Sequence, residues 1–389
     1  MISDHQKKPA NSPKRHEEAL KREKSSVMED IEFGEVKEDE FDAATAKTTA
    51  QQRPRRAKKK RKALSVLLTC GIYSFCSVIT VLTNKSLASG YNHLLKPQSP
   101  DTVDDDINLN LILVVAQALI TILCVRFCKY IRLVDYPSFA IQTARKWVVV
   151  NLWFCAMLYT GICALQYNSV PMVIVYRNLT NILVTVGDYG LFAANSSRVR
   201  ARESWGVIMA FFIMLSGAIL ASYSNESTST KGLFWMVLNG ITTAAYILSM
   251  KLQTVKLSKF GLVYYNHVML ILWLLPLSIW KGEWTILIKS PDLWHTLEYW
   301  LTMGFNGMVG FGLNFASLHC VAATGPTTYA IVGSFNKIPM VVLGYLWFEA
   351  TTFSIATWIW IAVSLWGGFL YSYKKITSRR KPIEVESPS

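Results

Sequence analysis

The sequence predicts an all-α polytopic membrane protein with about ten transmembrane helices. Of its 389 residues, 51% are hydrophobic and only 17% are charged, and the charged residues concentrate outside the apolar stretches. A bilayer offers no hydrogen-bond partners to a peptide backbone, so each stretch long enough to cross it should be a helix. Too little polar chain remains to surround a large soluble core. The expected spans are 64–88, 108–126, 146–167, 170–193, 204–223, 232–250, 261–280, 298–320, 326–348 and 353–373.

Three parts follow one another along the chain. Residues 1–62 mix acids, bases, Ser, Pro and Gln with few aromatic residues, which predicts a disordered cytosolic tail. Residues 63–375 should form one ten-span domain, and 376–389 a cytosolic C-terminal tail. The first 25 residues are hydrophilic, so we expect no cleavable signal peptide and the first span should direct its own insertion.

The positive charge indicates how the spans are oriented. A net charge of +14 could suggest a nucleic-acid partner, but the basic residues lie beside the spans and in every second loop. This is the positive-inside pattern, which places both termini in the cytosol and disfavours a role in nucleic-acid binding. The basic segments are 53–62, 126–146, 198–202, 251–259 and 374–381.

The residues that enzymes and metal sites use are poorly arranged here. All seven cysteines lie in apolar stretches without ligand spacing, and no two histidines stand at i and i+4. The expected spans contain no pair of acids suited to acid–base catalysis. We therefore expect neither an enzyme nor a metal or other cofactor.

Lys337 is the residue that points most directly to a function. It lies well inside the apolar run Pro326–Phe348. A cation at such a depth costs roughly 3–17 kcal/mol, so it usually faces a water-filled cavity, a bound anion or an acidic partner. Asp188 is nearly the only acid well inside the expected spans, so it is the main candidate for an ion pair.

Polar stripes accompany the two cations of the spans. Tyr329, Gly333, Asn336 and Lys337 stand at i, i+4, i+7 and i+8, on one helix face. Gly333 leaves room there for a ligand or a neighbouring backbone. Arg177, Asn181, Thr185 and Asp188 form a similar stripe. Arg177 could bind a phosphate, or it could hold the bundle together through Asp188 or backbone carbonyls.

Two further spans carry polar side chains. Tyr73, Ser77, Thr80 and Asn84 share one face of the first span, but Ser and Thr often only join helices, so Tyr73 is the ligand candidate there. The seventh span opens with Tyr264-Tyr265-Asn266-His267. An Asn can read the edge of a nucleobase and a Tyr can stack on it, although aromatic residues at a span end can also form an interfacial belt.

The fourth and ninth spans resemble each other. Val173-Ile174-Val175-Tyr176-Arg177-Asn178 parallels Ile331-Val332-Gly333-Ser334-Phe335-Asn336, and each carries an Asn and an adjacent cation. Five spans in each half would make the second half an inverted copy of the first, with halves of about 63–195 and 203–375. Transporters built from inverted repeats hold their substrate near the membrane midplane.

The motifs resemble those of the nucleotide-sugar transporter family, within the drug/metabolite transporter superfamily. Gly333-Ser334-Phe335-Asn336-Lys337 is similar to the Gly-Ala-Leu-Asn-Lys motif of its guanine-nucleotide members, and Tyr264–His267 is similar to their Phe-Tyr-Asn-Asn motif. Thr83-Asn84-Lys85, Ala164-Leu165-Gln166-Tyr167 and Arg177-Asn178-Leu179-Thr180 also match. The resemblance covers nearly all of residues 64–375.

This resemblance implies exchange of cytosolic GDP-mannose for lumenal GMP across the Golgi membrane, without a cofactor. It implies that Asn266 reads the base and that Lys337 binds the phosphates. Tyr329, Gly333 and Asn336 would line the sugar end opposite Tyr73. The full set of predicted substrate-binding residues is Tyr73, Arg177, Asn178, Tyr265, Asn266, His267, Asn314, Tyr329, Gly333, Ser334, Asn336 and Lys337.

Alternative functions remain open at this point. His267 replaces the second Asn of the base-reading motif and cannot offer the paired edge of an amide. The substrate could therefore be GDP-fucose or a non-guanine nucleotide sugar, and a non-transporting scaffold on the same fold is a further alternative. Membrane lipids are expected partners, and small residues on the helix surfaces could support a homodimer.

Overall fold

The computed structural model describes residues 64–91, 94–95, 108–192, 205–225, 228–253, 257–348 and 353–380. The N-terminal tail, the acidic segment 101–106, the basic segment 198–202 and most of the C-terminal tail lie outside the described residues. The helices from Val66 onward belong to one compact unit.

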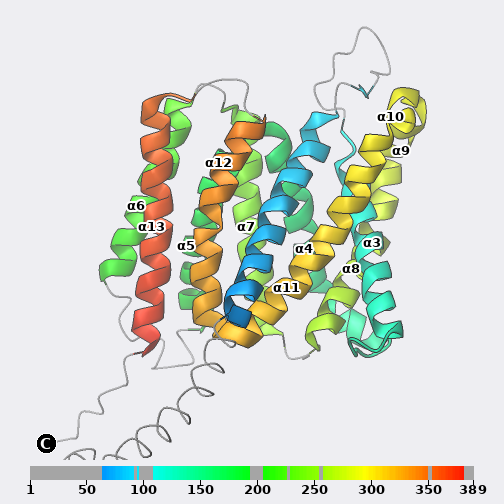
Figure 1. Cartoon of the computed structure of the whole chain (residues 1–389), viewed down its shortest axis with the longest axis horizontal. Helices are drawn as coiled ribbons and strands as arrows, with labels where there is room; N and C mark the ends of the chain where they lie inside the picture. Colours follow the sequence, from blue (N-terminus) through cyan, green and yellow to red (C-terminus); the bar gives the residue numbers. More distant parts are fainter. Residues whose placement is uncertain are drawn as a thin grey trace, which may run out of the picture. The chain divides into compact units, whose positions relative to one another are not determined.

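Ten helices of the described chain are long and apolar enough to cross a membrane, which confirms the predicted all-α polytopic class. The described residues contain no β-strand. The first helix spans Leu64–Gly90 and is drawn in blue (Figure 1). The others are α3 (Asn110–Tyr130), α4 (Ile141–Tyr167), α5 (Val170–Phe192), α6 (Trp205–Ser224), α7 (Thr230–Leu252), α8 (Lys259–Trp280), the short α9 (Glu283–Lys289) and α10 (Pro291–His295), α11 (Leu297–Phe335), α12 (Lys337–Phe348) and α13 (Ile355–Arg380).

The C-terminal helices extend beyond the expected boundaries. α11 is 39 residues long and contains the eighth candidate span, Leu297–Thr324, together with the first residues of the ninth, Ile331–Phe348. Pro326, between these spans, lacks a backbone N–H and favours a bend over a straight continuation. α11 ends at Phe335 and α12 begins at Lys337, with Asn336 between them. α13 continues to Arg380, past the expected end at residue 373, because Lys and Arg are good helix formers.

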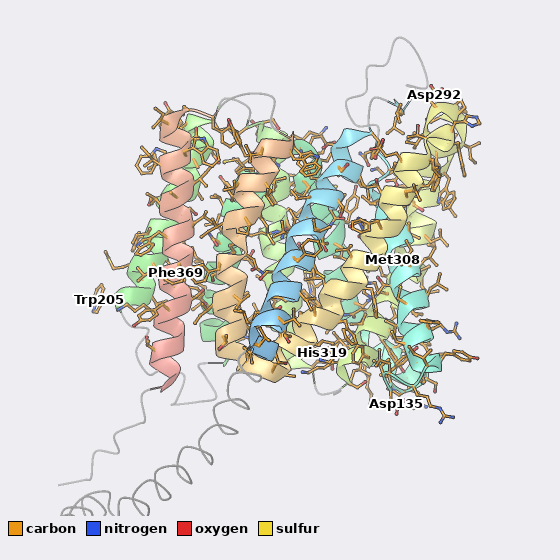
Figure 2. The ribbon with its side chains drawn as sticks, in the orientation of Figure 1. Asp135, Trp205, Asp292, Met308, His319 and Phe369 are labelled. Atoms are coloured by element: carbon orange, nitrogen blue, oxygen red, sulfur yellow. The ribbon has the colours of Figure 1, made fainter. Side chains whose placement is uncertain are left out.

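The described chain enters and leaves the bundle at the same end. The first span begins, and α13 ends, at the lower end in Figure 1, whereas α9 and α10 lie at the upper end. Figure 2 shows Asp135, before α4, at the lower end and Asp292, on α10, at the upper end. This arrangement fits an even number of membrane crossings.

Helices far apart in the sequence pack in a regular set of pairs. α6 packs against α13, α3 against α8, and α5 against α12. Counted along the chain, these are the fifth and tenth, the second and seventh, and the fourth and ninth spans. α4 also packs against α7, the third span against the sixth, and the expected division into two inverted halves stays a prediction.

Lys85 fastens the first span to the end of α4. Its side chain is buried, and its Nζ donates hydrogen bonds to the carbonyl oxygens of Leu165 (2.7 Å) and Asn168 (2.8 Å). The last carbonyls of a helix lack partners within that helix and carry its negative dipole end. Lys85 therefore has a structural role at the end of α4.

Candidate functional site

A cavity of about 440 Å³ lies in the middle of the bundle. Its wall is formed by the first span, α3, α4, α5, α7 and α12, so it joins residues from both ends of the sequence. Most of its polar groups are amides, hydroxyls and two cations. The lining residues are Asn84, Val114, Gln117, Met157, Leu158, Gly161, Ile162, Leu165, Arg177, Thr180, Asn181, Asn239, Thr243, Ile247 and Lys337.

Arg177 and Lys337 face this cavity together. Within the described part of the chain, neither is ion-paired with a carboxylate. Asp188, the acid expected to be within reach, instead pairs with Lys251 at 2.5 Å, and the other ion pair of the described residues is Lys281–Glu283. Two cations without a counter-charge are unfavourable in a site of low dielectric constant, and a bound anion would compensate them.

The surroundings of the two cations differ. Lys337 Nζ donates a hydrogen bond to Asn178 Oδ1. Asn178 is fully buried, and its Nδ2 donates to the carbonyl oxygen of Ser364 (3.1 Å), so α13 fixes the amide that orients the ammonium group. Arg177 makes no hydrogen bond to any residue that the structure describes. Its guanidinium group therefore keeps its donors available to a ligand in the cavity.

Tyr73 lies against Tyr329 and Gly333, as the family resemblance implied, and their role in a binding site stays a prediction. The rings of Tyr73 and Tyr329 are 4.8 Å apart between centroids, and Tyr73 is 8% exposed. A Cβ atom on Gly333 would stand 3.5 Å from Tyr73 Oη, an ordinary van der Waals distance, so Gly333 lies beside the phenol. These contacts close the first span against α11.

The remaining polar residues around the junction of α11 and α12 have different partners. Ser334 Oγ lies 2.9 Å from Ser372 Oγ, which joins α11 to α13. Asn336 is 4% exposed, and its Nδ2 has no hydrogen-bond partner among the described residues. A buried amide without a partner is costly, so Asn336 is a donor available for a ligand or for another conformation of the helix junction.

The structure places the span-7 motif outside the wall of the central cavity. Tyr265 Oη donates to the carbonyl oxygen of Ser138 (2.8 Å) and accepts from the N–H of Ala140 (2.8 Å), so this phenol fastens the start of α4. His267 Nδ1 lies 2.7 Å from the carbonyl oxygen of Val263, in its own helix. Neither side chain lies in the wall that carries Arg177 and Lys337.

Asn266 is also engaged within the protein. Its Oδ1 accepts a 2.7 Å hydrogen bond from Trp147 Nε1, and its Nδ2 donates to Tyr246 Oη at 3.3 Å. The side chain is 1% exposed. In this conformation, its amide edge therefore joins α4, α7 and α8 and is not presented to a nucleobase.

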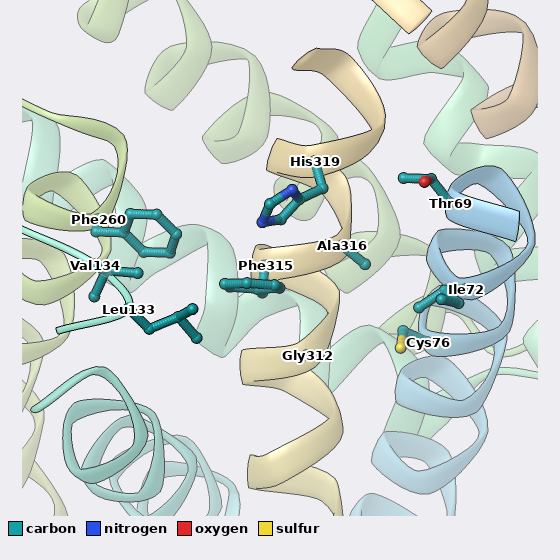
Figure 3. Close-up of a pocket in the computed structure, with 10 residues that line it drawn as sticks. All are labelled: Thr69, Ile72, Cys76, Leu133, Val134, Phe260, Gly312, Phe315, Ala316 and His319. Atoms are coloured by element: carbon teal, nitrogen blue, oxygen red, sulfur yellow. The ribbon is translucent and has the colours of Figure 1, made fainter. Parts of the chain in front are cut away.

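A second cavity, of about 540 Å³, lies between the first span, α8 and α11, beside residues 133–134 (Figure 3). Its wall is largely apolar and aromatic. Phe315 and His319 on α11 have ring centroids 4.4 Å apart and face toward Phe260 and Leu133. Asn314 lies on the same helix, but its Nδ2 donates to the carbonyl oxygen of Gly310 (3.0 Å), and it is not among the lining residues.

Several polar residues of the central cavity were not predicted as ligand candidates. They are Asn84, Gln117, Thr180, Asn181, Asn239 and Thr243. Gln117 and Asn239 are the only Gln and the only Asn in the middle of their apolar stretches, and this isolation was the available signal. Their convergence on one cavity depends on how α3 and α7 pack, which no single stretch of sequence contains.

Comparison with known proteins adds evidence that is independent of this geometry. No protein-family model matches the chain. A GDP-mannose transporter of Aspergillus niger is 28% identical over 340 residues, which cover 82% of each protein. One of Komagataella pastoris is 27% identical over 343 residues, covering 84% of this chain and 96% of the relative. One of Phaeosphaeria nodorum is 28% identical over 374 residues, covering 88% and 91%.

These matches support membership of the nucleotide-sugar transporter family. The matched region extends over more than four-fifths of the chain. The relatives are named as transporters, in agreement with the expectation that the chain is not an enzyme. The described residues also contain no group of His, Cys, Asp and Glu that could hold a metal ion.

Proposed function

We propose that the protein carries GDP-mannose across the Golgi membrane, from cytosol to lumen, in exchange for GMP. The observation that carries this proposal is the pair of cations, Arg177 and Lys337, in the wall of a mid-bundle cavity without a carboxylate partner in the described chain. The printed names of the relatives supply the choice of GDP-mannose among anionic ligands.

The two cations suit the diphosphate of a nucleotide sugar. An Arg can bind two phosphate oxygens with its planar fork, and a Lys adds a compact positive charge. Asn178 holds the Lys337 ammonium group in place, while Arg177 keeps its donors available. Amides and hydroxyls occupy much of the remaining polar wall, and these groups suit the sugar. We propose that Tyr73, Tyr329, Gly333 and Asn336 close the site on the side of α11.

Alternating access is the proposed mechanism. The two five-span halves would be inverted repeats that rock about the cavity and expose it to one side of the membrane at a time. The contacts between equivalent spans, such as α6 with α13, support this relation. Exchange follows if the carrier reorients slowly when no ligand is bound, because Arg177 and Lys337 are then uncompensated in a low dielectric. No covalent bond is made or broken.

The proposed orientation in the membrane rests on where the basic residues lie. The loops at the end where the described chain begins and ends carry most of the basic residues, which favours the cytosolic side for that end. Lys129, Arg132, Lys251 and Lys259 are described residues of these loops and helix ends. The second cavity would then open toward the cytosolic side.

Another nucleotide sugar is the second candidate substrate, and one observation favours considering it. The amide of Asn266, which the family resemblance assigns to guanine, is hydrogen-bonded to Trp147 and Tyr246 in this structure. Its neighbour His267 cannot present an amide edge. Competition by GMP, UMP, CMP and AMP against radiolabelled GDP-mannose separates the candidates. Strong competition by GMP alone supports a guanine site, and preference for another base contradicts it.

The test of exchange uses purified protein in liposomes. Labelled GDP-mannose should enter vesicles preloaded with GMP and should enter empty vesicles far more slowly. Lys337→Met should abolish this uptake, because the phosphates lose a counter-charge inside the membrane. Lys251→Met removes a lysine that pairs with Asp188 at a helix end and serves as the matched control. Equal uptake into empty and loaded vesicles contradicts exchange, and full activity of Lys337→Met contradicts the phosphate site.

A further inference from the structure

Asn84 and Gln117 form an amide pair in the wall of the central cavity. Gln117 Nε2 donates a 2.6 Å hydrogen bond to Asn84 Oδ1. Asn306 Nδ2 donates to the same Oδ1 at 2.8 Å, and Thr83 Oγ1 donates to Asn306 Oδ1 at 2.7 Å. Asn306 is 1% exposed and lies behind the cavity wall, whereas Asn84 and Gln117 are half-buried and line it.

This network fixes which atoms of the pair are left for a ligand. Asn84 Oδ1 already accepts two hydrogen bonds, so the amide of Asn84 is held in one orientation. Asn84 Nδ2 and Gln117 Oε1 make no hydrogen bond to any described residue. The pair therefore offers the donor group Asn84 Nδ2 and the acceptor Gln117 Oε1, in the same cavity as the two cations.

We infer that Asn84 and Gln117 bind two neighbouring hydroxyl groups of the sugar, and so help to set sugar specificity. The inference rests on the proposed function and names the part of the site that would read the sugar. A sugar hydroxyl both donates and accepts. One hydroxyl donates to Gln117 Oε1, and the oxygen of the next accepts from Asn84 Nδ2. The diphosphate binds Arg177 and Lys337, so the sugar extends from these cations toward the first span and α3.

The neighbouring amide Asn239 illustrates a different use of a polar side chain in the same wall. Its Nδ2 donates to the carbonyl oxygen of Met157 (2.9 Å) and to Thr160 Oγ1 (3.2 Å), so it joins α7 to α4. Asn84 and Gln117 differ because their mutual bond orients them without using the outward-facing atoms. A site that hydrogen-bonds a substrate hydroxyl rejects an analogue without it, since the amide is then left unpaired.

The test compares GDP-mannose, which carries the sugar, with GMP, which lacks the sugar and one phosphate. The dissociation constants of GDP-mannose and GMP are measured for the purified full chain. Gln117→Met keeps the length of the side chain and removes the acceptor Oε1 together with the donor Nε2, while Asn306 Nδ2 still holds Asn84 Oδ1. It should raise the dissociation constant of GDP-mannose roughly tenfold, as expected for one lost hydrogen bond. The dissociation constant of GMP should change by less than about twofold, because GMP has no hexose to lose this contact.

Thr121→Val is the matched control. Its hydroxyl donates to the backbone oxygen of Gln117 (2.8 Å) one turn further along α3, and Thr121 is not part of the cavity wall. This variant should change neither dissociation constant. Equal weakening of GDP-mannose and GMP by Gln117→Met, or no change in either, overturns the inference.

A second test uses substrate analogues on the wild-type protein, so its main result does not depend on whether a variant folds. GDP-mannose analogues that each lack one sugar hydroxyl should lose about tenfold in affinity at two adjacent positions. Gln117→Met should become insensitive to one of these two deletions, as in a double-mutant cycle. Equal sensitivity to every deletion overturns the inference while leaving the transport proposal intact. A wild-type chain that binds neither GMP nor GDP-mannose overturns the proposed function itself.

Discussion

Glu283 accepts a 2.9 Å hydrogen bond from the backbone N–H of Ile112, in the first turn of α3. A second backbone N–H, of Leu111, donates to the same carboxylate at 3.3 Å, and Lys281 Nζ lies 3.4 Å from it. Glu283 is fully buried at the start of α9. The first N–H groups of a helix lack partners and carry its positive dipole end. The segment between α8 and α11 therefore supplies the cap of α3.

Removing this cap should destabilise the protein. Glu283→Ala leaves two backbone N–H groups of α3 buried without an acceptor, at a cost of about 1–3 kcal/mol. A lower melting temperature of the purified protein would show it. Glu298→Ala is a suitable control, because among the described residues the Glu298 carboxylate accepts only an exposed hydrogen bond from Tyr91. An equal effect of the two substitutions would contradict the cap.

The buried carboxyl of Glu283 also makes stability depend on pH. Burial raises its pKa above the ordinary value of 4.5, although the N–H groups of α3 and Lys281 oppose the shift. A raised pKa in the folded state stabilises the fold below the unfolded pKa, and this contribution is lost as pH rises through the folded pKa. Glu283→Gln does not titrate. The melting temperature of the wild type minus that of Glu283→Gln should therefore fall as pH is raised from about 4.5 to about 8. A constant difference would exclude this group as the cause.

Lys85 and Lys337 should respond in opposite ways to the same substitution. Lys85→Met leaves the carbonyl oxygens of Leu165 and Asn168 without this donor, so it should lower the melting temperature and the yield of folded protein. Lys337→Met removes a cation without a described acidic partner, so it should fold normally and lose transport. Melting curves and uptake measured on both variants decide this. A folded, fully active Lys85→Met would show that the capping contact is dispensable.

Gly217 allows α6 and α13 to approach each other. A Cβ atom there would stand 2.7 Å from the backbone nitrogen of Ser364, and backbone cannot move aside cheaply. Gly217→Ala should therefore lower stability by at least about 1 kcal/mol. Gly304→Ala is the matched control, because nothing lies within 4 Å of its added Cβ. That control should be neutral or stabilising by up to about 1 kcal/mol, since Ala favours a helix more than Gly. Thermal unfolding of the two variants gives the comparison.

Cys70 and Cys320 provide a probe of the proposed rocking motion. Their Sγ atoms lie 3.6 Å apart, between the first span and α11. A disulfide between them would hold these helices together beside Tyr73 and Tyr329. Mild oxidation should therefore stop transport, and a reducing agent should restore it. Cys70→Ser should be resistant to the oxidant. Full transport by protein with the disulfide formed would contradict movement at this contact.

Much of the fold could be predicted from the sequence, because the bilayer imposes a simple rule. Stretches such as 108–126 and 232–250 are apolar over the length of a span and had to become helices. The ends of the helices could be predicted less well than the helices themselves. α11 runs from Leu297 to Phe335 and so continues across the interval between the expected spans 298–320 and 326–348.

The candidate site was predictable only in part. A cation in an apolar run is visible without a structure, so Lys337 and Arg177 were found. The contact of Tyr73 with Tyr329 also agrees with the prediction that these residues face each other. Asn266 and Tyr265 belong to a motif that the sequence analysis assigned to the substrate site. In the structure, Asn266 instead accepts a hydrogen bond from Trp147, and Tyr265 donates one to Ser138. The spacing of residues along the sequence does not determine which group a buried polar side chain will hydrogen-bond.

The sequence by itself determined that this chain crosses a membrane about ten times and places cations in its fourth and ninth spans, because the costs of burying backbone and charge apply to each segment separately. The tertiary structure alone decided that Asp188 pairs with Lys251 and that Asn84 and Gln117 share a cavity with Arg177 and Lys337. These outcomes depend on which helix faces pack together, and that is settled by the whole bundle at once.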